Sequence, residues 1–252
     1  ARRSQRSGDA IKDAVIVTQD PASYHLLLAA GFRSLLHPVL HWGERALHGR
    51  GHDVVQSMLF CTLHQLSSMG YDTILHDVDI VWRQDPRVAL LGNPAWSKVD
   101  IIGAHAPRWD AHGPMNSGFV YFRSNKKVRS YLRTMVELTP IMFWIGSDQV
   151  IYNSLLRHWR FRQLHFHVVP RNAVVDLHTT DGKDGTIKMI NDETSLLHVI
   201  SDWVPHKINR LKLAKLWYVK DKCLRAATQR NTHQSLDTRT CPKVSDMCTD
   251  GV

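Results

Sequence analysis

Short apolar runs alternate along the chain with longer stretches in which apolar residues recur every three or four positions. Because the side-chain period is two in a strand and 3.6 in a helix, the short runs predict buried strands and the longer stretches predict amphipathic helices. This alternation predicts an α/β fold with a Rossmann-like, mostly parallel sheet flanked by helices. We expect strands at residues 14–18, 71–79, 100–104, 118–122 and 164–169, and helices at residues 21–31, 54–69, 126–138, 148–157 and 205–216.

The second of these strands ends in two carboxylates, Asp77 and Asp79, which are separated by a single residue. Side chains two apart on a strand point to the same face, so the two charges are expected to lie together at the end of the strand. Like charges repel unless a cation or hydrogen-bond donors offset them, and hard oxygen ligands suit Mg²⁺ or Mn²⁺. A solvated turn is the alternative interpretation of so short a pattern, but the apolar flanks favour a metal site.

Composition indicates one large, folded and basic domain. With 252 residues, 43% of them hydrophobic, the chain can bury a sizeable core. A formal net charge of +9 favours anionic partners, such as nucleic acid, nucleotide phosphates, acidic glycans or membrane headgroups. We expect residues 1–12 to form a flexible N-terminal segment, residues 13–219 the domain, and residues 220–252 a polar extension.

Four cysteines add little to this picture. Cys61 lies in an apolar helical stretch and is expected to be a buried thiol. The pairing of Cys223, Cys241 and Cys248 stays open, although Cys241 and Cys248 could form a disulfide in an oxidising compartment. The absence of a Cys-x-x-Cys pattern disfavours a structural zinc site, and no run of about 20 apolar residues predicts a membrane span.

Four segments occur in an order that resembles a known family: Asp77-Val78-Asp79, Asn116-Ser117-Gly118, Asp148-Gln149, and His198 followed by Lys207. Over residues 14–219 the chain resembles the nucleotide-diphospho-sugar transferases, which include plant extensin arabinosyltransferases, rhamnogalacturonan xylosyltransferases and a protist α-galactosyltransferase. The resemblance implies a single GT-A-type domain and a retaining hexosyl- or pentosyltransferase. It also implies a UDP-sugar donor, a glycan or glycoprotein acceptor, an α-linkage, and a location in the Golgi or another secretory-pathway lumen, as a soluble fragment of a type II membrane protein.

The resemblance also implies roles for particular residues. Asp77, Asp79 and His198 match the ligands of Mn²⁺, for which Mg²⁺ can substitute, and His206 is an alternative third ligand. Thr18 ends the first strand and is expected at the same crevice, because ligands bind beyond the carboxyl ends of parallel strands. The remaining positions match residues that contact the donor diphosphate, the donor sugar or the reacting carbon: Asn116, Ser117, Asp148, Gln149, Lys207 and Arg210.

Other interpretations remain open at this level. Asn116-Ser117-Gly118 could be a plain turn, and Asp148 could be a helix cap or first-turn acid. The same carboxylates could serve a phosphoryl-transfer or nuclease-type enzyme, or the chain could be an inactive binding protein with a GT-A fold. No nucleic-acid partner is expected under the glycosyltransferase interpretation.

Overall fold

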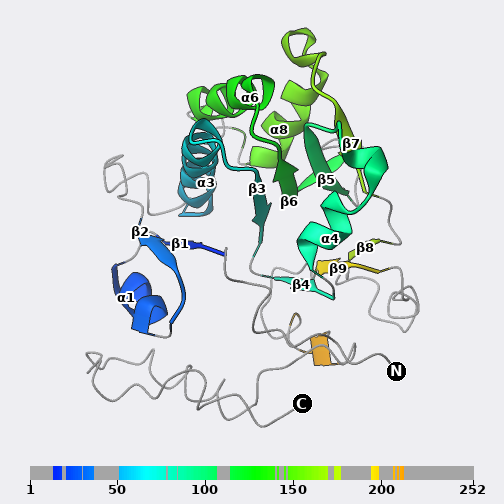
Figure 1. Cartoon of the computed structure of the whole chain (residues 1–252). Helices are drawn as coiled ribbons and strands as arrows, with labels where there is room; N and C mark the ends of the chain where they lie inside the picture. Colours follow the sequence, from blue (N-terminus) through cyan, green and yellow to red (C-terminus); the bar gives the residue numbers. More distant parts are fainter. Residues whose placement is uncertain are drawn as a thin grey trace. The chain divides into compact units, whose positions relative to one another are not determined.

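The computed structural model describes residues 14–18, 21–29, 31–36, 51–77, 79–83, 85–106, 114–139, 141, 145, 147–169, 173–176, 194–198, 207, 209, 211 and 212 (Figure 1). The chain divides into two compact units, residues 1–41 with 217–252 and residues 42–216, and each is described by itself. The expected end segments, 1–12 and 220–252, lie outside the described residues, as do the three C-terminal cysteines.

The described part of the first unit is a small βαβ element. Strand β1 (Ile16–Thr18) leads into helix α1 (Pro21–Ala29) and then into strand β2 (Ser34–Leu36), which pairs parallel with β1. Pro21 begins α1, where its fixed φ angle suits the first helical turn and its missing N–H costs nothing. The strand and the helix are those expected from the sequence, whereas β2 was not predicted.

The second unit contains a four-stranded sheet with the order β3-β6-β5-β7. Its strands are β3 (Thr73–His76), β6 (Met115–Phe122), β5 (Ile101–His105) and β7 (Phe166–Val168). Strand β6 runs antiparallel to both β3 and β5, while β5 and β7 are parallel. The α/β class is confirmed, and the described strands form mixed sheets rather than the mostly parallel sheet expected.

A separate three-stranded sheet has the order β4-β9-β8. It consists of β4 (Ile80–Trp82), β9 (Leu196–His198) and β8 (Val174–Asp176), with β9 antiparallel to β4 and parallel to β8. The single strand expected over residues 71–79 is therefore wrong at its end: β3 stops at His76, and both carboxylates lie in the link to β4. The link turns because the N–H of Ile80 bonds back to the carbonyl of Asp77 at 3.2 Å.

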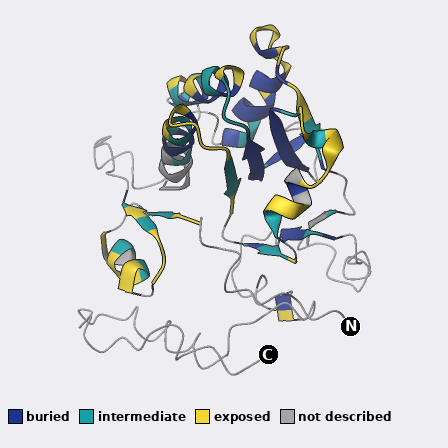
Figure 2. Ribbon diagram, viewed as in Figure 1, coloured by how far each residue is buried: buried dark blue, intermediate teal, exposed yellow. Residues whose placement is uncertain are grey.

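Both faces of the central strands are buried, which explains why β5 and β6 have apolar residues at nearly every position (Figure 2). On one face, α3 (Gly51–Ser68), α6 (Lys126–Glu137) and α8 (Asp148–Arg157) enclose a core that includes Ile101, Phe122, Tyr131 and Tyr152. On the other face, a second cluster joins the sheet to α4 (Pro86–Leu91) and to the three-stranded sheet: Ile102, Phe119 and Tyr121 with Leu90, Ile80 and Leu196.

Local signals set several helix ends as predicted. The hydroxyl of Ser147 accepts from the N–H of Val150 and caps α8, and the side-chain oxygen of Asn125 accepts from the N–H of Val128 and caps α6. Gly70 follows α3 with a positive φ of 93°. Short 3₁₀ turns are formed by η1 (Pro94–Trp96) and η2 (Trp159–Phe161). Cys61 is a free thiol and is partly rather than fully buried. No helix in the described part of the chain is both long and apolar enough to span a membrane.

Candidate active site

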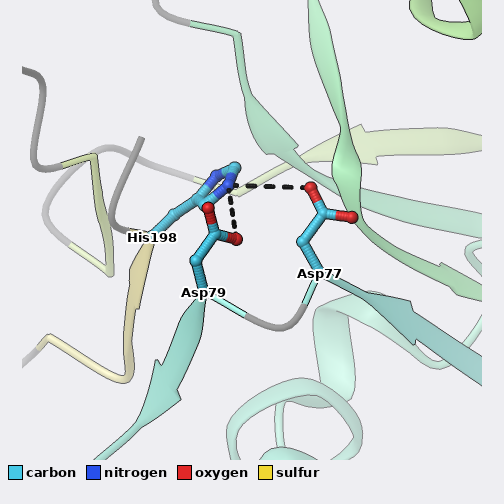
Figure 3. A group of neighbouring side chains, drawn as sticks. All are labelled: Asp77, Asp79 and His198. Atoms are coloured by element: carbon cyan, nitrogen blue, oxygen red, sulfur yellow. Dashed lines mark ion pairs between the residues drawn. The ribbon is translucent and has the colours of Figure 1, made fainter. Parts of the chain in front are cut away.

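Two carboxylates and an imidazole converge where the two sheets of the larger unit meet (Figure 3). Asp77 follows β3, Asp79 precedes β4, and His198 ends β9, whose pairing with β4 places His198 opposite Ile80. The Nε2 atom of His198 lies 3.5 Å from Oδ1 of Asp79 and 3.9 Å from Oδ2 of Asp77. The three ligand atoms lie within 4.8 Å of one another, so one cation could contact all of them.

The environment of these three groups fits a metal ion. The side chains of His198 and Asp79 are only 5% and 13% exposed, whereas that of Asp77 is 52% exposed, so the site opens to solvent on the Asp77 side. Oδ1 of Asp79 is buried and has no hydrogen-bond partner among the described residues. A buried acceptor left this way costs about 1–3 kcal/mol, and a cation would remove that cost. Two carboxylates and an imidazole form a ligand set suited to Mn²⁺ or Mg²⁺.

Lys207 approaches the same group. Its Nζ atom donates to Oδ2 of Asp79 at 2.5 Å. Burial alone raises the pKa of Asp79, but the side chains of His198 and Lys207 outweigh it and lower this pKa to about 2. Asp79 is therefore ionised at neutral pH, which is the state that binds a metal.

Gly118 lies directly against this cluster. A Cβ atom on Gly118 would lie 2.5 Å from Oδ2 of Asp77, 2.9 Å from Oδ1 of Asn116 and 2.9 Å from Cε1 of His198. These distances are too short for any side chain, so only glycine permits this packing. Its role was not predicted, although a glycine inside an apolar strand is a signal of close approach.

A bulge in β6 places its polar residues at the site. Between the pairs Gly103–Val120 and Ala104–Asn116, β5 advances one residue while β6 advances four. Bulges of this kind redirect side chains and are common beside active sites. Asn116 and Ser117 therefore belong to a strand, and the plain turn considered from the sequence is wrong. The side-chain oxygen of Asn116 accepts a hydrogen bond from the N–H of Gly118 at 2.7 Å.

The first turn of α8 contacts this bulge. The Ser117 hydroxyl donates to Oδ1 of Asp148, and the Ser117 N–H donates to Oε1 of Gln149, both at 3.3 Å. Oδ1 of Asp148 also accepts from the N–H of Gln149 at 2.7 Å. Asp148 is thus a buried acidic residue in the first turn of α8, which is one of the alternatives considered from the sequence. It also accepts a hydrogen bond from Ser117.

Asn153 anchors α8 to the start of β6. Its Oδ1 accepts from the N–H of Met115 at 3.1 Å, and its Nδ2 donates to the Met115 carbonyl at 2.8 Å. Nδ2 also donates to the carbonyl of Gln149, four residues earlier. No role for Asn153 was expected from the sequence, where its only local signal is its helical spacing from Gln149.

Not every expected site residue is brought to this cluster. Thr18 ends β1 in the other unit and is described apart from it. Arg210 and His206 lie outside the described residues, as does the loop at residues 107–113. The structure therefore groups eight of the expected residues around Gly118: Asp77, Asp79, Asn116, Ser117, Asp148, Gln149, His198 and Lys207.

These features define a class of protein: an α/β protein with a candidate divalent-cation site beside the ends of strands and a lysine that contacts one of its carboxylates, an arrangement suited to a phosphorylated ligand. The sequence model of the nucleotide-diphospho-sugar transferases matches residues 9–211, and the chain belongs to this family. It is therefore a glycosyltransferase with a GT-A-like domain, of the class that uses nucleotide-sugar donors.

Two solved structures are similar to the chain. One is a glycosyltransferase involved in the glycosylation of the major capsid of PBCV-1, with 12% identity, a TM-score of 0.47, and coverage of 79% of this chain and 98% of that chain. The other is mouse xyloside xylosyltransferase 1 in its apo form, with 11% identity, a TM-score of 0.42, and coverage of 73% and 83%. A comparison with curated proteins found no match.

Proposed function

We propose that the chain is a metal-dependent retaining glycosyltransferase that moves a sugar from a UDP-sugar to a hydroxyl group of a glycan or glycoprotein, forming an α-linkage. The observation that carries this proposal is the convergence of Asp77, Asp79 and His198 beside the bulge of β6, in a chain of the nucleotide-diphospho-sugar transferase family. Membership of this family supports a nucleotide-sugar donor. The three ligand groups form a site at which a metal ion could bind the donor diphosphate.

The donor diphosphate would bind at the solvent-open side of the three ligand groups. Asp77, Asp79 and His198 would hold Mn²⁺ or Mg²⁺, which acts as a Lewis acid towards the diphosphate when it is bound. Lys207 already contacts Asp79, so its ammonium group lies close enough to neutralise the charge that develops on the departing nucleotide. Arg210 is proposed to assist Lys207, and Thr18 to contact the nucleotide.

The donor sugar would lie over the β6 bulge and the first turn of α8. Asn116 and Ser117 would contact its hydroxyl groups. Since the Gln149 carbonyl accepts from Ser117, its NH₂ group is the part that can donate to the donor. The buried carboxylate of Asp148 would stabilise the positive charge of the reacting carbon. The bond from this carbon to the phosphate oxygen breaks, the bond to the acceptor oxygen forms on the same face, and the acceptor proton passes to the leaving phosphate.

The cellular setting follows from the same proposal. Glycan and glycoprotein acceptors are modified in the Golgi and other secretory-pathway compartments, and we propose this location for the chain. The choice between a hexosyl and a pentosyl donor is left to measurement.

A donor screen tests the proposal. UDP release from UDP-galactose, UDP-xylose, UDP-arabinose and UDP-glucose, with GDP-sugars as comparison, would be measured with Mn²⁺, with Mg²⁺ and with EDTA. We expect metal-dependent turnover of at least one UDP-sugar. Binding without turnover of any donor would indicate an inactive GT-A-fold protein. Turnover of nucleic acid or phosphate esters instead would favour the phosphoryl-transfer alternative.

Two substitutions make this screen specific. Asp79→Asn is expected to lower turnover by at least about 100-fold, since it removes a charged ligand without changing the side-chain shape. Asp85→Asn is the matched control, because Asp85 caps α4 away from the site and asparagine caps a helix equally well. Equal activity in the two variants would contradict the proposal.

A further inference from the structure

A cavity of about 440 Å³ lies between α3, α6 and the η2 turn, away from the candidate active site. Its lining is strongly basic. In the described part of the chain its lining has four cationic side chains, one carboxylate and one imidazole: Lys126, Arg129, Arg133, Arg160, Glu137 and His64. Lys126, Arg129 and Arg133 are three, four and seven residues apart on α6, so they lie along one side of the helix.

This cavity is separate from the candidate active site. The active-site residues of β6 lie near its start, whereas α6 begins after its end. A strand rises about 3.3 Å per residue, so Phe122 at the end of β6 lies roughly 13 Å from Gly118. No residue of the active site lines the cavity. Its charge therefore serves something other than the donor diphosphate.

The positive charges in this cavity are largely unneutralised. Glu137 pairs with Arg133 at 2.9 Å. Lys126, Arg129 and Arg160 make no ion pair with any residue in the part of the chain that the structure describes. Arg129 is partly buried, and the guanidinium group of Arg160 lies over the Phe161 ring at 5.7 Å from its centroid. Like charges held together in this way repel one another, and an anionic ligand would relieve that repulsion.

The uncharged lining indicates the kind of anion. Ser68, Ser130 and Thr134 add three hydroxyl groups, which can donate to and accept from sugar hydroxyls. Among the residues that the structure describes, the lining contains no phenylalanine, tyrosine or tryptophan on which a nucleic-acid base could stack. Arginine side chains bind carboxylate and sulfate groups through paired N–H donors.

We propose that this cavity binds an acidic oligosaccharide, carrying carboxylate or sulfate groups, at a site distinct from the catalytic one. The anionic groups would contact Lys126, Arg129 and Arg160, and the sugar hydroxyls would contact the serine and threonine side chains. A site of this kind would bind an acidic glycan while sugar transfer takes place at the candidate active site. Binding here does not depend on turnover at Asp79.

Binding would be measured by calorimetry on the full chain, with tetragalacturonate as the carboxylate probe and a heparin-derived hexasaccharide as the sulfate probe. Maltohexaose and a six-nucleotide single-stranded DNA are the neutral and nucleic-acid comparisons. We expect at least one acidic oligosaccharide to bind with a one-to-one stoichiometry and to bind more tightly than the DNA. The acidic probe that binds more tightly shows whether the site prefers carboxylate or sulfate groups. DNA binding as tight as that of both oligosaccharides would overturn the proposed ligand class, and inorganic phosphate competing fully at low millimolar concentration would indicate a simple anion site.

Matched variants separate this cavity from the general basic charge of the chain. The double variant Lys126→Gln, Arg129→Gln is expected to weaken binding by at least about tenfold and to reduce its salt dependence. Lys98→Gln, Arg162→Gln removes the same charge from exposed positions outside the cavity and should change binding less than about twofold. Equal losses in both double variants would overturn the proposal. Asp79→Asn should leave this binding unchanged, so failure here is distinguishable from failure of the proposed transferase activity.

Discussion

The main chain of Gly118 lies against the carboxylate of Asp77. The N–H of Asp77 donates to the Gly118 carbonyl at 2.8 Å, and a Cβ atom on Gly118 would come within 2.5 Å of Oδ2 of Asp77. A residue of the bulge thus contacts both the main chain and the side chain of the first candidate metal ligand. This relationship joins the three candidate metal ligands to the bulge of β6.

Gly118→Ala is therefore expected to displace the Asp77 carboxylate or the His198 ring. We expect at least about tenfold weaker binding of Mn²⁺, with a loss of UDP-sugar turnover. Calorimetric titration with Mn²⁺ measures this effect directly. Gly103→Ala is the matched control, because its new Cβ would also be crowded, at 2.4 Å, but by the flexible end of Met115. The control should lose stability without losing affinity for Mn²⁺, and similar Mn²⁺ affinities in both variants would count against the role assigned to Gly118.

Asp148→Asn tests the charge proposed to face the reacting sugar. Asparagine can still accept the N–H of Gln149 and the hydroxyl of Ser117, so the first turn of α8 should persist. We expect kcat to fall by about 100-fold or more, because the positive charge of the transition state loses its stabilising anion. KM for the UDP-sugar and affinity for Mn²⁺ should change little. A kcat near that of the unmodified protein would show that Asp148 serves only the helix.

Asn153→Asp tests the anchor between α8 and β6. The substituted oxygen would face the carbonyl oxygens of Met115 and Gln149, which now accept from Nδ2. We expect a loss of about 1–3 kcal/mol in the free energy of unfolding, measured with urea, because buried carbonyls lose their donor and face a like charge. If Asn153 positions the site, kcat should fall while the affinity for Mn²⁺ is retained. A fall in stability alone would make the residue purely structural.

Asp100 provides a prediction for pH. Its carboxylate is 4% exposed and accepts from Asn125 at 2.7 Å and from Lys127 and the N–H of His165 at 2.9 Å. Burial by itself raises the pKa of Asp100, but these donors outweigh it and lower the pKa below its ordinary value. The folded state thus binds this proton less readily than the unfolded chain, so Asp100 stabilises the fold above pH 4 and loses that contribution as the pH falls below it.

Asp100→Asn should consequently lower stability at pH 7 and flatten the acid limb of the stability curve below about pH 4. Urea unfolding across this range measures both effects. The exposed pair of Asp85 and Arg87 is the comparison, since Asp85→Asn should change stability by less than about 1 kcal/mol at any pH. An unchanged acid limb in Asp100→Asn would contradict the proposed loss of the stabilising contribution of Asp100 at low pH.

Local patterns explain why some elements were predicted well. Helix α8 has the expected bounds because a serine cap precedes an acidic first turn and regularly spaced apolar residues. By contrast, β8 has only three residues, too few to show a period, and it exists because it pairs with β9. The break between β3 and β4 was missed for a similar reason, since β4 forms a separate strand by pairing with β9, which lies far along the chain.

The residue types of the candidate site were predicted from the sequence, but the contacts that hold them in place were not. The two carboxylates, His198 and Lys207 could be named from spacing and resemblance, because their chemistry is visible in the sequence. Gly118 and Asn153 have no reactive group, and their importance arises from contacts with residues far from them in sequence. The bulge of β6 likewise depends on the register with β5, which no local pattern specifies.

The candidate ligand groups are divided between the two sheets of the larger unit: Asp77 follows a strand of the four-stranded sheet, whereas Asp79 directly precedes one strand of the three-stranded sheet and His198 ends another. A cation shared among them would act as a cross-link between two separately hydrogen-bonded layers. Local opening of β4 and β9 would then require release of the ion, so their amide protons should exchange more slowly with solvent as Mn²⁺ is added, while those of β7 stay unaffected. Hydrogen–deuterium exchange would thus reveal loading of the site even where no sugar is transferred.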